Sequence, residues 1–238
     1  MPEKRIFSSF LLMNASIRPL CSVWNSSIGK KLIVALTGAV LVLFLAGHLT
    51  GNLLVFVGAQ AFNEYAEFLH HMLHGAGIWI ARIVLLSCLI LHVVATISLT
   101  RANRAASPKY VHEGTVQASR SSRIMIWSGL TILAFVIFHL LHFTVRIDAG
   151  LAEIGKTNPH QMVIVGFSHG LVVLFYLIAM TLLCSHLSHG VASMFQTLGL
   201  RSKKSAPLLA CISKGYALVI WLGFISIPLA IYLFHYGR

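Results

Sequence analysis

Five long runs of apolar residues, separated by short polar stretches, dominate the pattern along the chain. A helix needs about twenty apolar residues to cross the hydrocarbon core of a bilayer, and backbone facing lipid must satisfy its hydrogen bonds internally. The segments that meet this requirement are residues 29–57, 77–101, 122–146, 162–192 and 212–236. The stretches between them, such as 103–123 and 201–207, carry Pro and several charged residues and are predicted to be loops.

This pattern predicts an all-α integral membrane protein with five transmembrane helices. The composition agrees, because 57% of the residues are apolar and only 10% are charged, whereas charged residues make up about 25% of an ordinary soluble domain. We expect one transmembrane domain over residues 26–238, preceded by an N-terminal cytoplasmic extension over residues 1–25. No internal repeat or second domain is evident in the sequence.

The basic residues predict the orientation of the helices, since cytoplasmic ends carry the excess of Lys and Arg. Clusters of these residues precede the first span and follow the second and fourth, while most acidic residues fall at the opposite ends. The N-terminus is therefore expected in the cytoplasm and the C-terminus outside. The formal net charge of +12 is attributed to this orientation, and no nucleic-acid partner is expected.

A histidine in the middle of the first span is the first candidate for chemistry. His48 follows Gly47 and is followed by Gly51, and an ionisable residue within a membrane helix is a functional-site hypothesis by default. The two glycines would leave a shallow groove in which a flat ligand could lie, and haem is the simplest such ligand because its iron accepts imidazole nitrogen. Alternatively, Gly47 and Gly51 form only a helix-packing face, which would not exclude a haem.

Depth along the spans sorts four histidines into two pairs. At 1.5 Å per residue, His48 and His139 lie about 27 and 24 Å from the cytoplasmic ends of their spans, whereas His92 lies about 13 Å from its cytoplasmic end. His186 falls in the last turns before the cytoplasmic end of the fourth span. The two pairs thus differ in depth by roughly 15 Å, a stacking suited to passing electrons across the membrane.

Two further histidines are alternative ligands. His142 and His189 follow His139 and His186 by three residues, and residues three apart share a helix face. Periodicity alone does not choose between the members of each set. A single membrane histidine is also more often a hydrogen-bonding residue between helices than a metal ligand, so the haem hypothesis depends on the pairing.

Short motifs extend beyond the histidines in a fixed order. They are Phe44-x-x-x-His48-x-x-x-Asn52, then Gly58-Ala59-Gln60-Ala61-Phe62-Asn63, Leu91-His92, Phe135-Val136-x-x-His139, Arg146-Ile147, and Tyr176 ten residues before His186 with Ser188 and Gly190. From about Ser26 onward the chain resembles the membrane-anchor cytochrome b subunit of succinate:quinone oxidoreductase (succinate dehydrogenase or fumarate reductase). The form it resembles is the single-chain cytochrome b558 type with five helices and two haems.

The resemblance implies that helices one to four form a dihaem four-helix bundle. It pairs His48 with His139 at the outer, distal haem and His92 with His186 at the inner, proximal haem, which selects these residues over His142 and His189. Asn52 and Ser188 would support or pack against the ligands.

The resemblance also implies the partners. A flavoprotein subunit with FAD and an iron–sulfur subunit would dock on the cytoplasmic face, and the chain would hold two haems b and react with quinone, expected to be menaquinone, without a dicarboxylate site of its own. The sequence supports this division, because it has no dinucleotide-binding motif and no cysteine cluster. The location implied is the cytoplasmic (inner) membrane of a prokaryote.

Charged residues near the ends of the spans are candidates for contacts with haem propionates and quinone. Arginine and lysine bind carboxylates well, and the candidates are Lys30, Lys31, Arg120 and Arg123 on the inner side with Arg82 and Arg146 on the outer side. Each could equally anchor its helix at the membrane interface. Glu64 and Glu67 are the carboxylates nearest the distal haem and are candidate acid/base groups for quinone, although solvated loop glutamates are as common.

Two rival functions remain open from the sequence. A dihaem cytochrome b that anchors a hydrogenase or a formate dehydrogenase would also carry histidines on several helices. A haem-free bundle whose histidines relay protons or take part in transport is the second rival. Neither the direction of the succinate reaction nor the quinone follows from the sequence.

Overall fold

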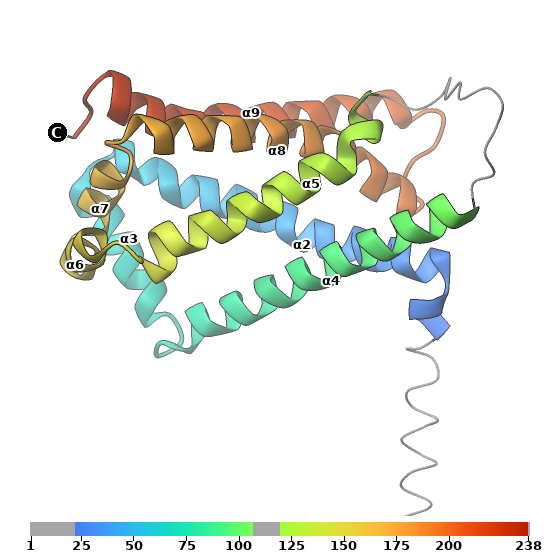
Figure 1. The fold of residues 1–238 in the computed structure, drawn as a ribbon, viewed down its shortest axis with the longest axis horizontal. Coiled ribbons are helices and arrows are strands. Elements are labelled where there is room, and N and C mark those ends of the chain that lie inside the picture. The colour runs from blue at the N-terminus through green and yellow to red at the C-terminus, as the bar shows by residue number, and fades with distance from the viewer. Residues whose placement is uncertain (1–21, 107–119, 238) are drawn as a thin grey trace, which may run out of the picture.

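The computed structural model describes residues 22–106 and 120–237, excepting the side chains at 106 and 120–124. These residues form helices and connecting turns, and five helices are long and apolar enough to cross a membrane (Figure 1). They are α2 (Ser27–Leu53), α4 (Ala76–Ala106), α5 (Arg120–His139), α8 (Gly170–Thr197) and α9 (Ala206–Leu233). The predicted all-α membrane fold with five spans is confirmed.

The fourth span begins later than predicted. Residues 162–166, which the hydropathy pattern joins to the fourth span, belong to a separate helix, α7 (Pro159–Gly166). The Asn158 side chain caps the start of α7 and Pro159 occupies its first turn, and α8 then starts at Gly170 after an extended His169. The prediction of one span over 162–192 is therefore wrong at its N-terminal end.

Four helical segments at one end of the bundle were not predicted as separate elements. The first span continues as a short 3-10 turn, η1 (Leu54–Phe56), and α5 continues as a π-helix, η2 (Leu140–Val145). Helix α3 (Ala59–His71) forms most of the connection after η1, and helix α6 (Ala149–Thr157) forms part of the connection after η2. Together with α7, they cover the end of the bundle drawn at the left of Figure 1.

Helix α2 packs against α4, α8 and α9, and α8 in turn packs against α5 and α9. Within the described chain, the diagonal pairs α2/α5 and α4/α8 have little direct backbone contact. Most side chains of the main apolar core belong to α8 and α9, joined by Leu49 of α2 and Phe135 of α5. The centre of the four-helix arrangement is therefore spanned by side chains rather than by closely packed backbones.

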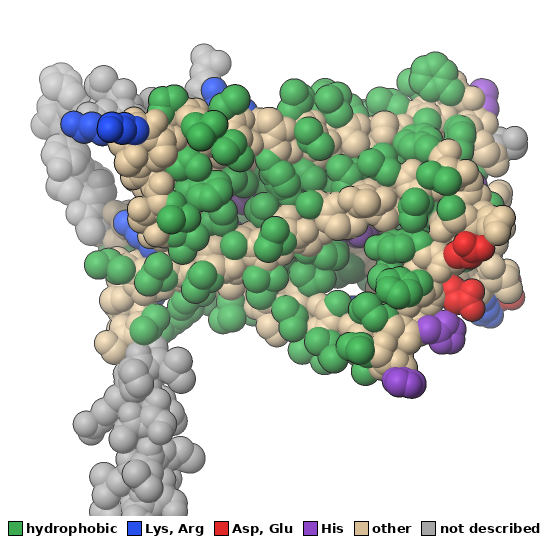
Figure 2. Space-filling view, turned by 180° about the vertical axis from the view of Figure 1, so that it is seen from behind, with side chains coloured by type: hydrophobic (Ala, Val, Ile, Leu, Met, Phe, Trp, Pro, Cys, Tyr) green, Lys and Arg blue, Asp and Glu red, His purple; other side chains and the backbone are tan. Residues whose placement is uncertain are grey.

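Charge separates the two ends of the bundle (Figure 2). The start of α2, the end of α4 and the α8–α9 connection carry most of the described Lys and Arg residues, and we name this the basic end. The described carboxylates, Glu64, Glu67, Asp148 and Glu153, all lie at the opposite, acidic end. The predicted segregation of charge is thus present, while the side of the membrane that each end faces stays a prediction.

A polar cluster ties the acidic end together. The Asn63 amide of α3 donates to Asn158 Oδ1 at 3.1 Å, and its own oxygen accepts from the His160 backbone N–H at 2.9 Å. The Val55 carbonyl accepts from the Tyr236 hydroxyl at 3.0 Å and lies 3.3 Å from His160 Nε2. These bonds connect α3, α7, the end of the first span and the C-terminal segment.

Replacement of Gly51 by Ala should destabilise the docking of α3 on the first span. A Cβ atom at this buried position would overlap the ring of Tyr65 from α3, and overpacking of this kind costs about 1–3 kcal/mol. We expect Gly51→Ala to lower the thermal unfolding temperature of the purified protein in detergent. Gly215→Ala is the matched control, because a Cβ at exposed Gly215 of α9 meets nothing within 4 Å, and an equal effect of both substitutions would contradict this packing.

Candidate functional site

The predicted outer pair, His48 and His139, comes together in the structure. The ring centroids lie 5.8 Å apart with an interplanar angle of 83°. Two imidazoles that ligate one metal ion from opposite sides, through bonds of about 2 Å, stand with their ring centres roughly 6 Å apart. We use the name outer pair because α2 and α5 both approach the acidic end at these residues.

The predicted inner pair, His92 of α4 and His186 of α8, lies at the level of Thr37 and Ser128, and the direct approach of its two rings stays a prediction. His92 Nδ1 lies 3.2 Å from the Thr37 hydroxyl and 3.2 Å from the Val34 carbonyl, both on α2. His186 Nδ1 lies 3.3 Å from the Ser128 hydroxyl of α5. Each inner histidine is thus held at one ring nitrogen by the neighbouring helix.

The outer pair has different partners. His139 Nδ1 lies 3.1 Å from the hydroxyl of buried Tyr176, and His142 Nδ1 lies 3.3 Å from the same oxygen. A phenol carries one hydrogen, so it can donate to one ring and accept from the other. If Nδ1 of His139 carries a proton, the bonds run from His139 to Tyr176 and on to His142.

Aromatic rings stack on both outer histidines from the preceding helical turn. Phe44 lies 5.1 Å from His48 with an interplanar angle of 18°, and Phe135 lies 5.8 Å from His139 at 30°. The Asn52 amide, one turn beyond His48, donates to the His48 carbonyl at 2.7 Å and lies 3.3 Å from the His48 Nδ1 atom. Stacking and this amide restrict the rotation of the rings.

The geometry distinguishes the facing histidines from the two alternatives. His139, and not His142, is the ring that stacks edge-on to His48. Helix α5 passes into the π-helix η2 directly after His139, and His142, within η2, shares the Tyr176 hydroxyl with His139. In α8 it is His186, and not His189, that contacts the Ser128 hydroxyl.

The expected groove beside His48 is only half present. A Cβ at Gly47 would meet no atom within 4 Å, which leaves that side open. At Gly51 the space is occupied by the ring of Tyr65. The glycine pair therefore serves two purposes, with one residue open beside His48 and the other packed against α3.

The donor set fits a haem better than a bare metal ion. Within residues 22–106 and 120–237, no group of three or more His, Cys, Asp or Glu side chains is placed to hold a metal. A bare zinc ion needs three or four protein ligands, whereas the porphyrin supplies four nitrogens and leaves two axial positions for imidazole. All four predicted ligand histidines are half-buried.

The propionate candidates at the basic end lie near the start of the first span. Lys30 is half-buried, and its ammonium lies 5.7 Å from the centre of the Trp24 ring, while Lys31 is exposed. Arg120 and Arg123 belong to α5, but their side chains lie outside the described ones. Their role in binding propionates stays a prediction.

The candidates at the acidic end are held by their neighbours. The Arg82 guanidinium lies 4.9 Å from the centre of the Trp79 ring, at an exposed position. Arg146 is half-buried, follows the π-helix with a left-handed φ of 57°, and packs its guanidinium over Gly155 of α6. Arg146 is thus the more ordered of the two.

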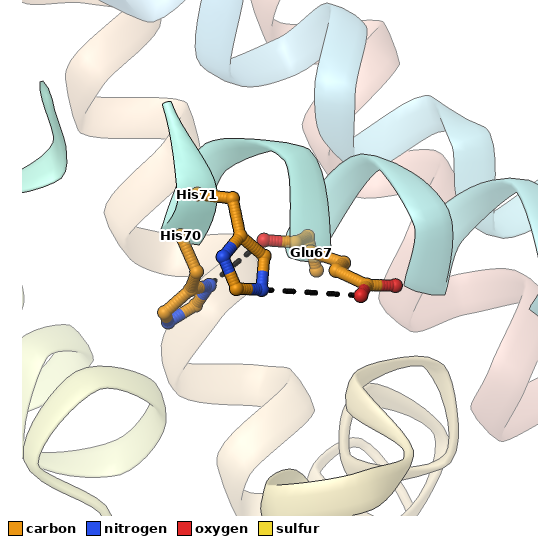
Figure 3. Close-up of polar contacts among 4 residues, drawn as sticks. Glu67, His70 and His71 are labelled. Carbon is orange, nitrogen blue, oxygen red and sulfur yellow. Dashed lines mark hydrogen bonds and ion pairs between the residues drawn. The ribbon is translucent and has the colours of Figure 1, made fainter. Parts of the chain in front are cut away.

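The two candidate quinone carboxylates are both exposed on α3. The Gln60 amide donates to Glu64 at 2.9 Å, and Glu67 pairs with the exposed ring of His71 at 3.9 Å (Figure 3). His70 turns to a backbone carbonyl of its own helix at 2.7 Å. In this arrangement the two glutamates lie at the rim of the acidic end, and their acid/base role stays a hypothesis.

The sequence analysis did not predict the hydroxyls of Thr37 and Ser128. A shared sequence pattern could have indicated them. In both α2 and α5 a Thr or Ser is followed directly by Gly, a Phe stands seven positions after the hydroxyl residue, and a His stands four positions after the Phe. The statement that the chain has no repeat therefore needs correction for this stretch.

Comparison with family models, curated proteins and solved structures returned no match.

Replacement of Tyr176 by Phe should destabilise the protein, because it removes the shared partner of two histidine nitrogens in an apolar environment. Leaving a buried polar group unpaired costs about 1–3 kcal/mol. We expect a lower thermal unfolding temperature for Tyr176→Phe in detergent. Tyr232→Phe, at an exposed position of α9, is the control, and equal stability of the two variants would rule out the shared hydrogen bond.

Proposed function

We propose that the chain is the dihaem cytochrome b membrane anchor of a succinate:quinone oxidoreductase. The observation that carries the proposal is the facing pair His48 and His139, with His92 and His186 held by hydroxyls of neighbouring helices at a second level of the same bundle. The outer pair, His48 and His139, would hold one haem b. The inner pair, His92 and His186, would hold the other.

The donor set determines the chemistry that a bound haem could supply. Held by one imidazole from each helix of a pair, a bound haem would supply one-electron transfer rather than oxygen binding. The chain's own residues fix the rings: Thr37 and Ser128 contact the inner pair, and Tyr176 contacts His139. Two sites stacked along the bundle would form an electron path across the membrane.

The ends of the bundle suit different partners. The Lys and Arg residues of the basic end support docking of the iron–sulfur and flavoprotein subunits there, on the cytoplasmic face. Quinone, proposed to be menaquinone, would react near the outer haem at the acidic end. The dicarboxylate site would belong to the flavoprotein subunit, which holds FAD.

The same donor set fits the anchor of a quinone-linked hydrogenase or formate dehydrogenase. Affinity purification of the tagged chain from mild detergent distinguishes these functions by the partner. We expect a flavoprotein and an iron–sulfur protein with succinate dehydrogenase activity. A co-purifying nickel or molybdenum enzyme would instead favour the second candidate.

A haem-free histidine relay is supported only by the chain of contacts from His139 through Tyr176 to His142. The absorbance spectrum separates it from the proposed function, because haem b gives an intense Soret band and a relay does not.

Alanine substitutions should remove the haems one at a time. His48→Ala or His139→Ala should leave about half of the haem absorbance with the inner haem intact, and His92→Ala or His186→Ala should leave the outer haem. His189→Ala is the control and should retain both haems, because His189 is not the α8 histidine that contacts Ser128. Haem content per chain and the α-band position measure this. Retention of both haems in the four ligand variants would refute the assignment.

Neutral replacements test the two carboxylates of α3. If either acts as the acid/base for quinone, Glu64→Gln or Glu67→Gln should lower quinol turnover by about 10²-fold or more, because positioned proton transfer contributes 10²–10⁴-fold. Haem content should stay normal, since both side chains are exposed. Glu153→Gln on α6 serves as the control. Unchanged turnover in both α3 variants would remove the hypothesis.

A further inference from the structure

The two inner histidines are held by matching parts of two different helices. Helix α2 presents Thr37 and Gly38 to His92 of α4, and α5 presents Ser128 and Gly129 to His186 of α8. In both cases the hydroxyl contacts Nδ1 of the ring. The next residue in both cases is a glycine against which the ring packs.

The hydrogens of the two hydroxyls are already committed to backbone carbonyls. Thr37 donates to the Ile33 carbonyl at 2.6 Å, and Ser128 donates to the Met125 carbonyl at 3.0 Å. A hydroxyl has one hydrogen and two acceptor lone pairs, so each oxygen is left to accept from the histidine. Both rings therefore carry their proton on Nδ1, and Nε2 keeps the free lone pair that a metal needs.

The neighbouring glycines allow the rings to lie against the helices. A Cβ at Gly38 would stand 3.3 Å from His92 Cε1, and one at Gly129 would stand 3.5 Å from His186 Cε1. The two rings thus approach their supporting helices in nearly the same way. A Cβ would be a tight contact at Gly38 and an ordinary van der Waals contact at Gly129.

The match extends along both helices to the outer pair. In each helix the hydroxyl residue stands eleven positions before the outer histidine. A phenylalanine, Phe44 or Phe135, stands four positions before the same histidine. Both phenylalanines stack on the outer histidine that follows. Helices α2 and α5 are therefore structural equivalents, and so are α4 and α8, which they support.

We propose that Thr37 and Ser128 are equivalent positioning residues, which hold the inner histidines with Nδ1 protonated and Nε2 directed at the iron of the inner haem. This inference rests on the proposed dihaem function. It adds that the two hydroxyls set the reduction potential of the inner haem. The outer haem would not be affected, because its ligands are contacted by Tyr176 and Asn52 instead.

The direction of the effect follows from the hydrogen bond. A ligand imidazole that donates through Nδ1–H is more basic and stabilises ferric iron, so loss of the acceptor should raise the potential. For His92 the Val34 carbonyl still accepts when Thr37 is changed, at 3.2 Å. Replacement of Ser128 should therefore raise the potential of the inner haem more than replacement of Thr37.

The experiment is a spectroelectrochemical titration of both haems in the purified full-length protein. The variants are Ser128→Ala and Thr37→Val, with the conservative exchanges Ser128→Thr and Thr37→Ser. Thr131→Val is the matched control, because the Thr131 hydroxyl of α5 bonds the Trp127 carbonyl at 3.0 Å instead of a histidine. The haem that remains in His48→Ala identifies the inner one.

We expect Ser128→Ala to raise the ratio of reduced to oxidised inner haem at a fixed potential by up to about tenfold, equivalent to about 59 mV for a one-electron couple. Thr37→Val should give a smaller rise, the outer haem should not change, and the conservative exchanges and Thr131→Val should match wild type. Loss of the inner haem in Ser128→Ala that Ser128→Thr restores would also support the proposal.

The positioning role would be overturned if the reduction potential of the inner haem did not change in Ser128→Ala, or if both haems shifted equally. It would also be overturned if Thr131→Val gave the same shift. Loss of the inner haem in both Ser128 variants would overturn it too. Absence of haem from the wild-type protein would refute the proposed function itself, so the two failures are distinguishable.

Discussion

The need to satisfy four imidazoles within an apolar layer governs this bundle. A polar nitrogen left unpaired there costs several kcal/mol, so each ring requires a partner on a neighbouring helix or turn. The residues that provide such contacts are Thr37, Ser128, Tyr176 and Asn52. Three of the rings are held only through Nδ1, and a haem iron would satisfy their second nitrogen.

The paired histidines lie on diagonal helices. His48 of α2 faces His139 of α5, and His92 of α4 is proposed to pair with His186 of α8, and both helix pairs have little backbone contact. The adjacent pairs α2/α4 and α5/α8 pack closely and bring the hydroxyls to the inner rings. Because α2 and α5 carry the same pattern, the two histidine pairs have similar helical surroundings. The pairs differ chemically in the residues that contact their rings.

Hydropathy was sufficient to predict the five spans, since crossing a bilayer demands long apolar runs. Depth along those runs predicted the approach of His48 to His139 that the structure shows. The start of α8 was missed because residues 162–167 are as apolar as the span that follows. The helices α3 and α6 were missed because short amphipathic segments resemble loops in a hydropathy profile. Thr37 and Ser128 were missed because hydroxyls in helices usually bond their own backbone, and only the packing of α4 and α8 shows the second bond.

Location of iron in crystals of the purified protein would test the account most directly. Anomalous scattering at the iron absorption edge should give two peaks for each chain, one between His48 and His139 and the other between His92 and His186. Absence of iron, or iron bound by His142 or His189 in place of the facing residues, would contradict the central claim.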